Sequence, residues 1–240
     1  MLKREVVLET RNLSMHFGGV RAVDNVDFEL REKELRCLIG PNGAGKSTFF
    51  KCLTGQLIPT SGDVVIRDIT MTGREPHDIA GLGVGIKTQV PNLFDGLSAQ
   101  ENLWLSARRW HADNRASILV KETIERLELG DIRLSLVGSL AHGQRQRVEL
   151  GMVVAADPWL VLLDEPAAGM TEEETYKTAE LIKEINQTSA LIVVEHDMNF
   201  IRAISNIVTL FHQGAIFMED TMDVISADPR AREIYLGHKT

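Results

Sequence analysis

Eight consecutive residues, from Gly40 to Ser47, combine glycines, a lysine and a serine in an order suited to binding phosphate. They read GPNGAGKS and match the pattern G-x-x-x-x-G-K-[ST]. Glycines let the backbone curl so that successive N–H groups point at phosphate oxygens, and a helix starting there adds its positive end. Lys46 is expected to reach the β- and γ-phosphates and Ser47 to ligate Mg²⁺. The segment predicts a P-loop that binds ATP.

Two carboxylates follow an apolar run later in the chain. The run from Trp159 to Leu163 has the length of a strand, and Asp164 and Glu165 come directly after it. In a parallel sheet this edge lies beside the P-loop. Asp164 can hold Mg²⁺ through water, and Glu165 can polarise an attacking water as a general base. Alone, the pattern also fits a solvated strand end, but together with the P-loop it predicts ATP hydrolysis.

Strands and helices that alternate along the chain must position these residues. Strand-like segments are predicted at Val6–Glu9, Val26–Leu30, Leu35–Ile39, Asp63–Ile66, Val84–Thr88, Leu160–Leu163, Leu191–Val194, Ile207–Phe211 and Ala215–Met218. Helices are predicted at Lys46–Leu57, Ala99–Arg109, Ala116–Leu127 and Gln144–Ala155, and another opens at the capping box of Thr171 and Glu174 and runs to about Asn186. This order predicts an α/β fold with a mostly parallel sheet covered by helices.

The segment 90–155 differs from the rest because helical patterns replace strand patterns there. We therefore predict one domain over residues 1–240. Residues 1–89 and 156–240 would form its α/β core, with a β-rich N-terminal part, and residues 90–155 an inserted helical subdomain.

Composition and charge narrow the function classes. The 240 residues are 44% hydrophobic and 25% charged, as in an ordinary globular protein, and the formal net charge is −8. Neither the totals nor any run of Lys and Arg indicates nucleic-acid binding. Cys37 and Cys52 lack metal-ligand spacing and are expected to be reduced core thiols. We found neither a bilayer-spanning apolar stretch nor a secretory signal, so a cytoplasmic location is expected.

These motifs resemble those of the ATP-binding subunits of ABC transporters, and the resemblance covers essentially the whole chain. It implies a P-loop NTPase core of the ABC ATPase type. Gln89 matches the glutamine that contacts Mg²⁺ and senses the membrane partner, and His196 matches the switch histidine that contacts the γ-phosphate. Phe17 lies where the family stacks an aromatic ring on adenine. Each could instead be a surface or core residue.

The family's signature, usually LSGGQ, reads LAHGQ at residues 140–144. By resemblance it opens a helix that clamps the γ-phosphate held by an opposing subunit, which implies a homodimer or a heterodimer. Ala141 replaces the usual serine and His142 a glycine. The segment Ala168–Thr171 also departs from the usual Ser-Ala-Leu-Asp.

The predicted site thus has three parts. The catalytic group is Glu165, His196 and Gln89, and the Mg²⁺ ligands are Ser47, Gln89 and Asp164. The nucleotide-binding group is Phe17, Gly40, Asn42, Gly43, Gly45, Lys46, Ser47, Thr48, Ala141, Gly143 and Gln144.

Shorter strings narrow the resemblance within the family. FGGVRAVDNV, DEPAAGM and EHDM resemble the importers of branched-chain amino acids, and LAHGQ with AGMT resembles the urea and short-chain amide branch. This implies permease subunits as partners, a solute-binding protein acting indirectly, and a peripheral location on the cytoplasmic face of the membrane. Leu93, Phe94, Leu103 and Trp104 would then offer apolar groups to a permease helix, or belong to the core.

Three other functions remain open at this point. An ABC ATPase without a transport role would carry a longer insertion than the roughly 50 residues between Gln89 and Leu140. An ATP-holding regulatory subunit that does not hydrolyse is suggested by Ala141, whereas Lys46, Glu165 and His196 favour hydrolysis. An exporter subunit would have the same chemistry.

Overall fold

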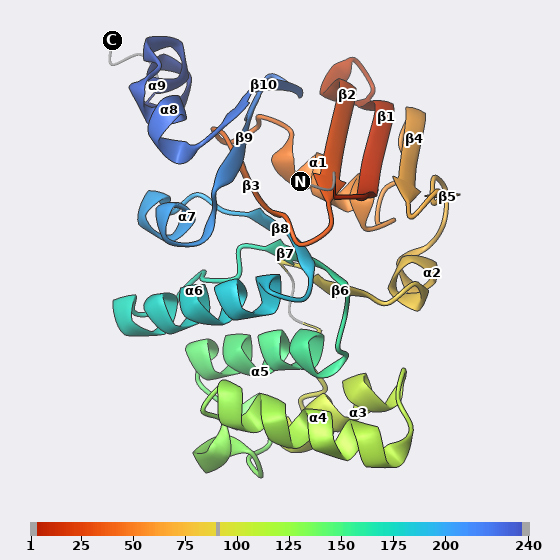
Figure 1. Cartoon of the computed structure of the whole chain (residues 1–240), viewed down its shortest axis with the longest axis vertical. Helices are drawn as coiled ribbons and strands as arrows, with labels where there is room; N and C mark the ends of the chain where they lie inside the picture. The colour runs from red at the N-terminus through yellow and green to blue at the C-terminus, as the bar shows by residue number, and fades with distance from the viewer. Residues whose placement is uncertain (1–3, 90–91, 237–240) are drawn as a thin grey trace.

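The computed structural model describes residues 4–89 and 92–236, and within them two sheets carry the fold. The N-terminal sheet is antiparallel, with the order β2-β1-β4-β5. Its strands are β1 (Val6–Phe17), β2 (Val20–Arg31), β4 (Ser61–Ile66) and β5 (Ile69–Thr70). They stand together at one side of the molecule (Figure 1).

The second sheet has six strands within the described residues, in the order β10-β9-β3-β8-β7-β6. They are β3 (Leu35–Ile39), β6 (Val84–Lys87), β7 (Leu160–Asp164), β8 (Ala190–Val194), β9 (Ile207–His212) and β10 (Ala215–Asp220). All neighbours pair in parallel except β10, which runs antiparallel to β9. The central strands β3, β7 and β8 are buried on both faces, which explains why they are mostly apolar, with Arg36 and Asp164 as the charged exceptions.

Helices cover this sheet on both sides. On the side of the N-terminal sheet lies α1 (Lys46–Leu53), with α2 (Pro76–Gly81) leading into β6. On the other side lie α5 (His142–Ala155), α6 (Glu172–Asn186) and α7 (Met198–Ile204). The chain ends in α8 (Met222–Ala227) and α9 (Pro229–Leu236). Two apolar clusters result, one on each face of the six-stranded sheet.

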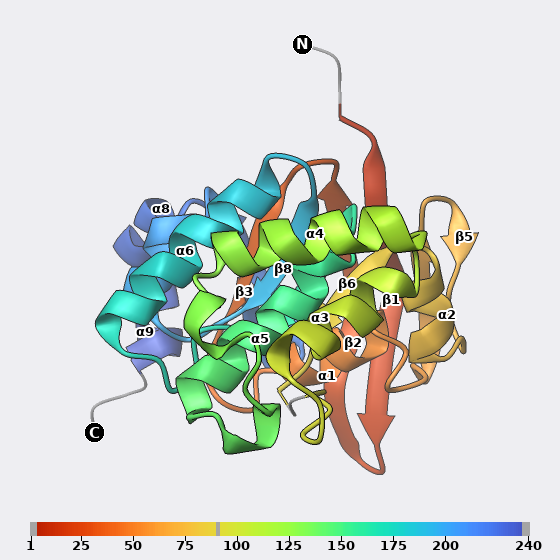
Figure 2. The ribbon, with the colours of Figure 1, turned by 90° about the horizontal axis from the view of Figure 1, so that it is seen from below.

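Helices α3 (Ala99–Arg108) and α4 (Asp113–Arg126) pack on the side of α5 away from the sheet. Figure 1 shows α5 between α6 and the pair of α3 and α4, and Figure 2, seen from below, shows α4 in front of the sheet. Short 3₁₀ turns at Gly130–Ile132 and Val137–Ser139 lead from α4 back to α5. One apolar cluster runs from the sheet through α5 to α3 and α4. The division into core and helical subdomain therefore stays a prediction.

Several predicted boundaries need correction. The helix starting at Lys46 ends at Leu53 rather than Leu57, because Gly55 adopts φ +72° and a side chain there would meet the Arg74 carbonyl. The first two strands are each 12 residues long, because bulges interrupt their alternation without ending the pairing. The short elements β5, α2, α7, α8 and α9 were not predicted. The helix at the Thr171 capping box is confirmed.

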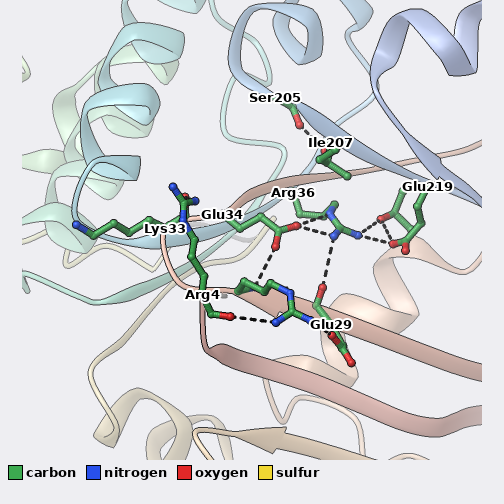
Figure 3. Close-up of polar contacts among 10 residues, drawn as sticks. Arg4, Glu29, Lys33, Glu34, Arg36, Ser205, Ile207 and Glu219 are labelled. Atoms are coloured by element: carbon green, nitrogen blue, oxygen red, sulfur yellow. Dashed lines mark hydrogen bonds and ion pairs between the residues drawn. The ribbon is translucent and has the colours of Figure 1, made fainter. Parts of the chain in front are cut away.

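An arginine network joins the two sheets at the N-terminal end of β3. Arg36 is 8% exposed, and its guanidinium donates to Glu34 and Thr209 and pairs with Glu219 on β10. A weaker contact reaches the Glu29 carbonyl on β2. Figure 3 shows Glu34, Glu219 and the backbone carbonyl of Glu29 around the Arg36 guanidinium. Because a buried cation needs paired acceptors, the network fixes β2 and β10 relative to β3.

Candidate functional site

The P-loop connects β3 to α1, and two of its glycines are required by close backbone contacts. Gly40 has φ +145°, and a Cβ there would lie 2.3 Å from the Phe211 carbonyl oxygen. Gly45 has φ +104°, and a Cβ there would lie 2.3 Å from the Ala22 carbonyl oxygen. Either side chain would force neighbouring backbone apart, so only glycine fits. The loop is thus held against β2 and β9.

A hollow of about 770 Å³ opens over this loop. Its walls come from the β1–β2 hairpin, the P-loop, the end of β7 and the segment after β8. The predicted site residues that line it are Phe17, Asn42, Gly43, Gly45, Lys46, Ser47, Thr48, Glu165 and His196. Val20, Arg21, Glu195 and Gln213 also line it and were not predicted. Phe17 is 48% exposed at the rim, where a planar base could stack.

Lys46 is half-buried in the loop. Its ammonium donates to the carbonyl oxygens of Gly40 at 2.6 Å and Pro41 at 3.0 Å. Burial lowers the pKa of Lys46, while the negative charges of Glu165 and Asp164 oppose that shift. The Lys46 ammonium is thus hydrogen-bonded to the loop and interacts electrostatically with the two predicted carboxylates.

Glu165 and His196 meet across the hollow from neighbouring strands. His196 Nδ1 lies 3.4 Å from Glu165 Oε1. Glu165 has φ +47°, an unusual backbone region for a residue with a side chain, and its N–H donates to the Val194 carbonyl at 2.9 Å. Such conformations persist where the surrounding structure holds them. The contacts bring a carboxylate and an imidazole to one point.

Asp164 lies at the end of β7 and is 4% exposed. Burial, together with the negative charge of Glu165, raises the pKa of Asp164 from its ordinary value of 3.8 to about 6. A carboxylate held this way, near other negative groups, suits a hard cation with oxygen ligands.

Gln89 is exposed just after β6 and is not among the described residues that line the hollow. Its loop is tied to α5 by Glu149. The ammonium of Lys87 lies 3.4 Å from Glu149 Oε2, with both side chains at least 96% buried, and Glu149 Oε1 accepts the Asn92 N–H at 3.1 Å. Burial raises the pKa of Glu149, and Lys87 opposes the shift. Both flanks of the Gln89 loop are thus attached to α5.

The predicted signature residues lie at the start of α5, also outside the residues described around the hollow. Ala141 is the N-cap, and the Gln144 side chain accepts its N–H at 3.0 Å. A side chain at Gly169 would come within 2.9 Å of the His142 ring. The His142 ring therefore packs over Gly169. His142 in the signature and Gly169 in the segment Ala168–Thr171 both depart from the usual family pattern, and the two residues are in contact.

Comparison with known proteins identifies the family. A profile described as "ABC transporter" matches residues 23–168, which is more than half of the chain. The chain belongs to the ABC transporter family. It is an ATPase of the ABC transporter type, and its fold is that of an ABC cassette.

Among similar ABC proteins is LivG of Salmonella typhimurium, strain LT2, a "high-affinity branched-chain amino acid transport ATP-binding protein". It is 34% identical over 96% of this chain and 98% of its own length. The ADP conformation of the cassette MJ1267 has a TM-score of 0.85 at 24% identity and covers 98% of this chain and all of MJ1267. A dimeric post-hydrolysis state of the cassette MJ0796, bound to ADP and Pi, has a TM-score of 0.80 at 25% identity and covers 90% and 98%.

None of the described helices combines the length and apolar character that crossing a bilayer requires. Cys37 and Cys52 are both buried free thiols, as expected, and burial raises the pKa of Cys37 to about 12.

Replacing Asp164 with asparagine is expected to stabilise this ABC cassette at neutral pH. The pKa of Asp164 is higher in the folded state than in the unfolded state, so the ionised carboxylate lowers the stability of the fold above pH 6. This loss of stability disappears as the pH falls from 6 towards 4. Asparagine removes it, which should raise the free energy of unfolding by about 2 kcal/mol at pH 7.5, after allowing for solvent screening. Urea unfolding with EDTA present measures this. Equal stabilities at pH 7.5 would contradict it.

Replacing Ala141 with serine should raise ATPase activity or lower the KM for ATP. A hydroxyl bonded to a phosphate oxygen is worth about 1.5–3 kcal/mol, or roughly 10- to 100-fold in affinity. A serine N-cap would also stabilise α5 by about 1 kcal/mol, so the melting temperature must be measured beside activity. Steady-state hydrolysis across protein concentrations is the assay. Activity at or below that of the parent throughout would show that the hydroxyl is not limiting.

Proposed function

We propose that this chain is the ATP-hydrolysing subunit of an importer and powers uptake of a small polar solute through separate permease subunits. The observation that carries the proposal is the likeness to LivG, which extends over nearly the full length of both proteins. The solute class is a branched-chain amino acid, urea or a short-chain amide. The chain would act on the cytoplasmic face of the membrane as a peripheral subunit.

The predicted roles follow from the hollow. Phe17 stacks on adenine, and the backbone from Gly40 to Thr48 holds the phosphates together with Lys46. Glu165 accepts a proton from the attacking water, and His196 contacts the γ-phosphate. The 3.4 Å approach of His196 to Glu165 supports this pairing, because both groups must face the same phosphate.

Mg²⁺ fits the donor set at this place. Asp164 and Ser47 offer the oxygen ligands that it prefers, and Gln89, outside the described lining of the hollow, is the third predicted ligand. Burial, together with the negative charge of Glu165, raises the pKa of Asp164, and a bound cation would offset this cost of the ionised carboxylate. When bound, Mg²⁺ would neutralise charge on the phosphates.

A second cassette would complete the site. Ala141, Gly143 and Gln144 begin α5 outside the residues that line the hollow, so in our proposal their N–H groups serve the nucleotide of a partner subunit. The dimeric MJ0796 cassette supports such an arrangement.

A groove of about 570 Å³ between α2, β6, α3 and α5 is our proposed contact for a permease helix. Thr88, Asn92 and Glu149, which flank or hold the Gln89 loop, line it together with Trp110. Of the two roles left open for Leu93 and Leu103, the structure supports the core role, because Leu103 is fully buried and Leu93 packs against the same apolar cluster. Phe94 and Trp104 are exposed but are not among the described groove residues.

Replacing Trp110 with glutamate should therefore impair assembly with the permease subunits and spare the basal ATPase activity of the isolated chain. Trp110 is 39% exposed, so a charge there can reach solvent until a partner covers it. Leu134, which is 72% exposed and is not among the described groove residues, gives the matched control Leu134→Glu. Co-purification with the permease measures assembly. Equal recovery of both variants would contradict the groove assignment.

The proposed function itself is tested by reconstitution. The chain, its permease subunits and a solute-binding protein are placed in proteoliposomes with leucine, urea or acetamide. We expect one solute class to stimulate ATP hydrolysis and to accumulate inside the compartment that the binding protein does not face. Hydrolysis that no solute stimulates, with no accumulation, would favour an ABC ATPase without an import role.

A further inference from the structure

A buried carboxylate lies beside the switch histidine and has no part in the roles given above. Glu195 directly follows β8, is 2% exposed and borders the nucleotide hollow. A buried carboxylate is costly unless its oxygens accept hydrogen bonds. The hydrogen-bond donors to Glu195 therefore show which segments of the chain this side chain connects.

Both oxygens of Glu195 accept backbone N–H groups, and they do so from two segments. Oε1 accepts the N–H of Ala167 at 3.2 Å, two residues after Glu165. Oε2 accepts the N–H of His196 at 2.9 Å and has a longer contact, 3.4 Å, with the N–H of Asp197. One side chain thus connects the segment that follows the predicted base to the segment that carries the switch histidine.

The same two segments show other signs of being held in place. Glu165 keeps its φ of +47° while its N–H donates to the Val194 carbonyl, next to Glu195. The His196 carbonyl accepts the Tyr235 hydroxyl of α9 at 3.4 Å. The His196 ring itself is 67% exposed, and its Nδ1 lies 3.4 Å from Glu165 Oε1 and 3.7 Å from Glu195 Oε2, so these two carboxylates and its backbone orient it. Hydrogen bonds to a charged acceptor are stronger than neutral ones, which suits Glu195 to this task.

We propose that Glu195 is a positioning residue for ATP hydrolysis. Its carboxylate fixes the distance between the Ala167 and His196 segments, so that Glu165 and His196 face the same phosphate. The proposal rests on the roles proposed above for Glu165 and His196. Glu195 itself contacts neither water nor phosphate in this account, and its effect on hydrolysis passes through its neighbours.

Glu195→Gln tests this with almost no change in volume. Both oxygens face N–H donors, so in either orientation the new amide NH₂ points at a donor and one of the two connections breaks. We expect kcat to fall about 10- to 100-fold, as for the loss of one hydrogen bond to a charged group. The affinity for ADP should change less than about threefold, because the P-loop contacts remain.

Double-mutant kinetics separate positioning from a general role in folding. If Glu195 acts through His196, Glu195→Gln added to His196→Ala should cost no more than about twofold beyond His196→Ala alone. Glu195→Asp keeps the charge and should recover part of kcat, while the exposed Glu122→Gln on α4 is the neutral control. Melting temperatures of all variants show whether each one folds.

Each outcome decides the proposal. Parental kcat in Glu195→Gln, or losses that multiply with those of His196→Ala, would overturn it. A kcat loss matched by a lower melting temperature in both Glu195→Gln and Glu195→Asp would assign Glu195 to folding alone. If the parent protein hydrolyses no ATP, the proposed function is wrong, and the positioning role of Glu195 is wrong as well.

Discussion

Glu165→Gln is expected to reduce ATP turnover by at least about 100-fold while ATP still binds, since a general base contributes about 10²- to 10⁴-fold. Glutamine keeps the size of the side chain but cannot accept the proton of the attacking water. The contacts to nucleotide from the P-loop stay in place, because Glu165 follows β7 and is not part of the loop. Phosphate release measures turnover, and equilibrium binding of labelled ATP measures affinity.

Glu122→Gln, an exposed exchange of the same kind on α4, should leave turnover unchanged. If Glu165→Gln kept most of the parental rate, Glu165 would not be the base. Asp164 or Glu195 would then be the carboxylates left to consider around the site.

Lys46→Ala should weaken nucleotide binding by about 10- to 100-fold, the effect of losing a hydrogen bond to a charged group. The loss of nucleotide affinity has a second cause in this chain. Glu165 and Asp164 both interact with the Lys46 ammonium, so its removal leaves their negative charges facing the phosphates unopposed. Titration with a fluorescent ATP analogue gives the Kd.

Lys121→Ala, an exposed lysine on α4, is the matched control and should bind like the parent. An unchanged Kd in Lys46→Ala would mean that the loop's backbone alone holds the phosphates. It would also remove the lysine from the proposed mechanism.

The sequence predicted those helices and strands whose own residues favour a single secondary structure. β3 lies at its predicted bounds, because a buried, mostly apolar segment ends at a glycine. α6 starts at its capping box. The long β1–β2 hairpin was underestimated, since its bulges break the alternation that marks a strand. The short helices α7 to α9 have little periodicity, and tertiary contacts rather than local sequence define them.

The candidate site likewise contains residues that the sequence predicted and contacts that it did not. Residues within one short motif, such as Lys46 and Ser47, were found because their spacing has a mechanism. Contacts between distant segments were not found. The buried pair of Lys87 and Glu149 and the packing of His142 over Gly169 join residues 62 and 27 positions apart, and no local pattern reveals them. Glu195 gave one signal only, its place beside His196.

In the proposed dimer, two cassettes close around ATP, with the P-loop of one facing the signature residues 140–144 of the other. The most direct measurement is the mass of Glu165→Gln by size-exclusion chromatography with light scattering, with and without Mg·ATP. We expect a mass of 26.7 kDa without nucleotide and twice that mass with Mg·ATP, falling back to 26.7 kDa when EDTA and ADP replace it. A mass of 26.7 kDa at every ATP concentration, with ATP shown to be bound, would contradict it.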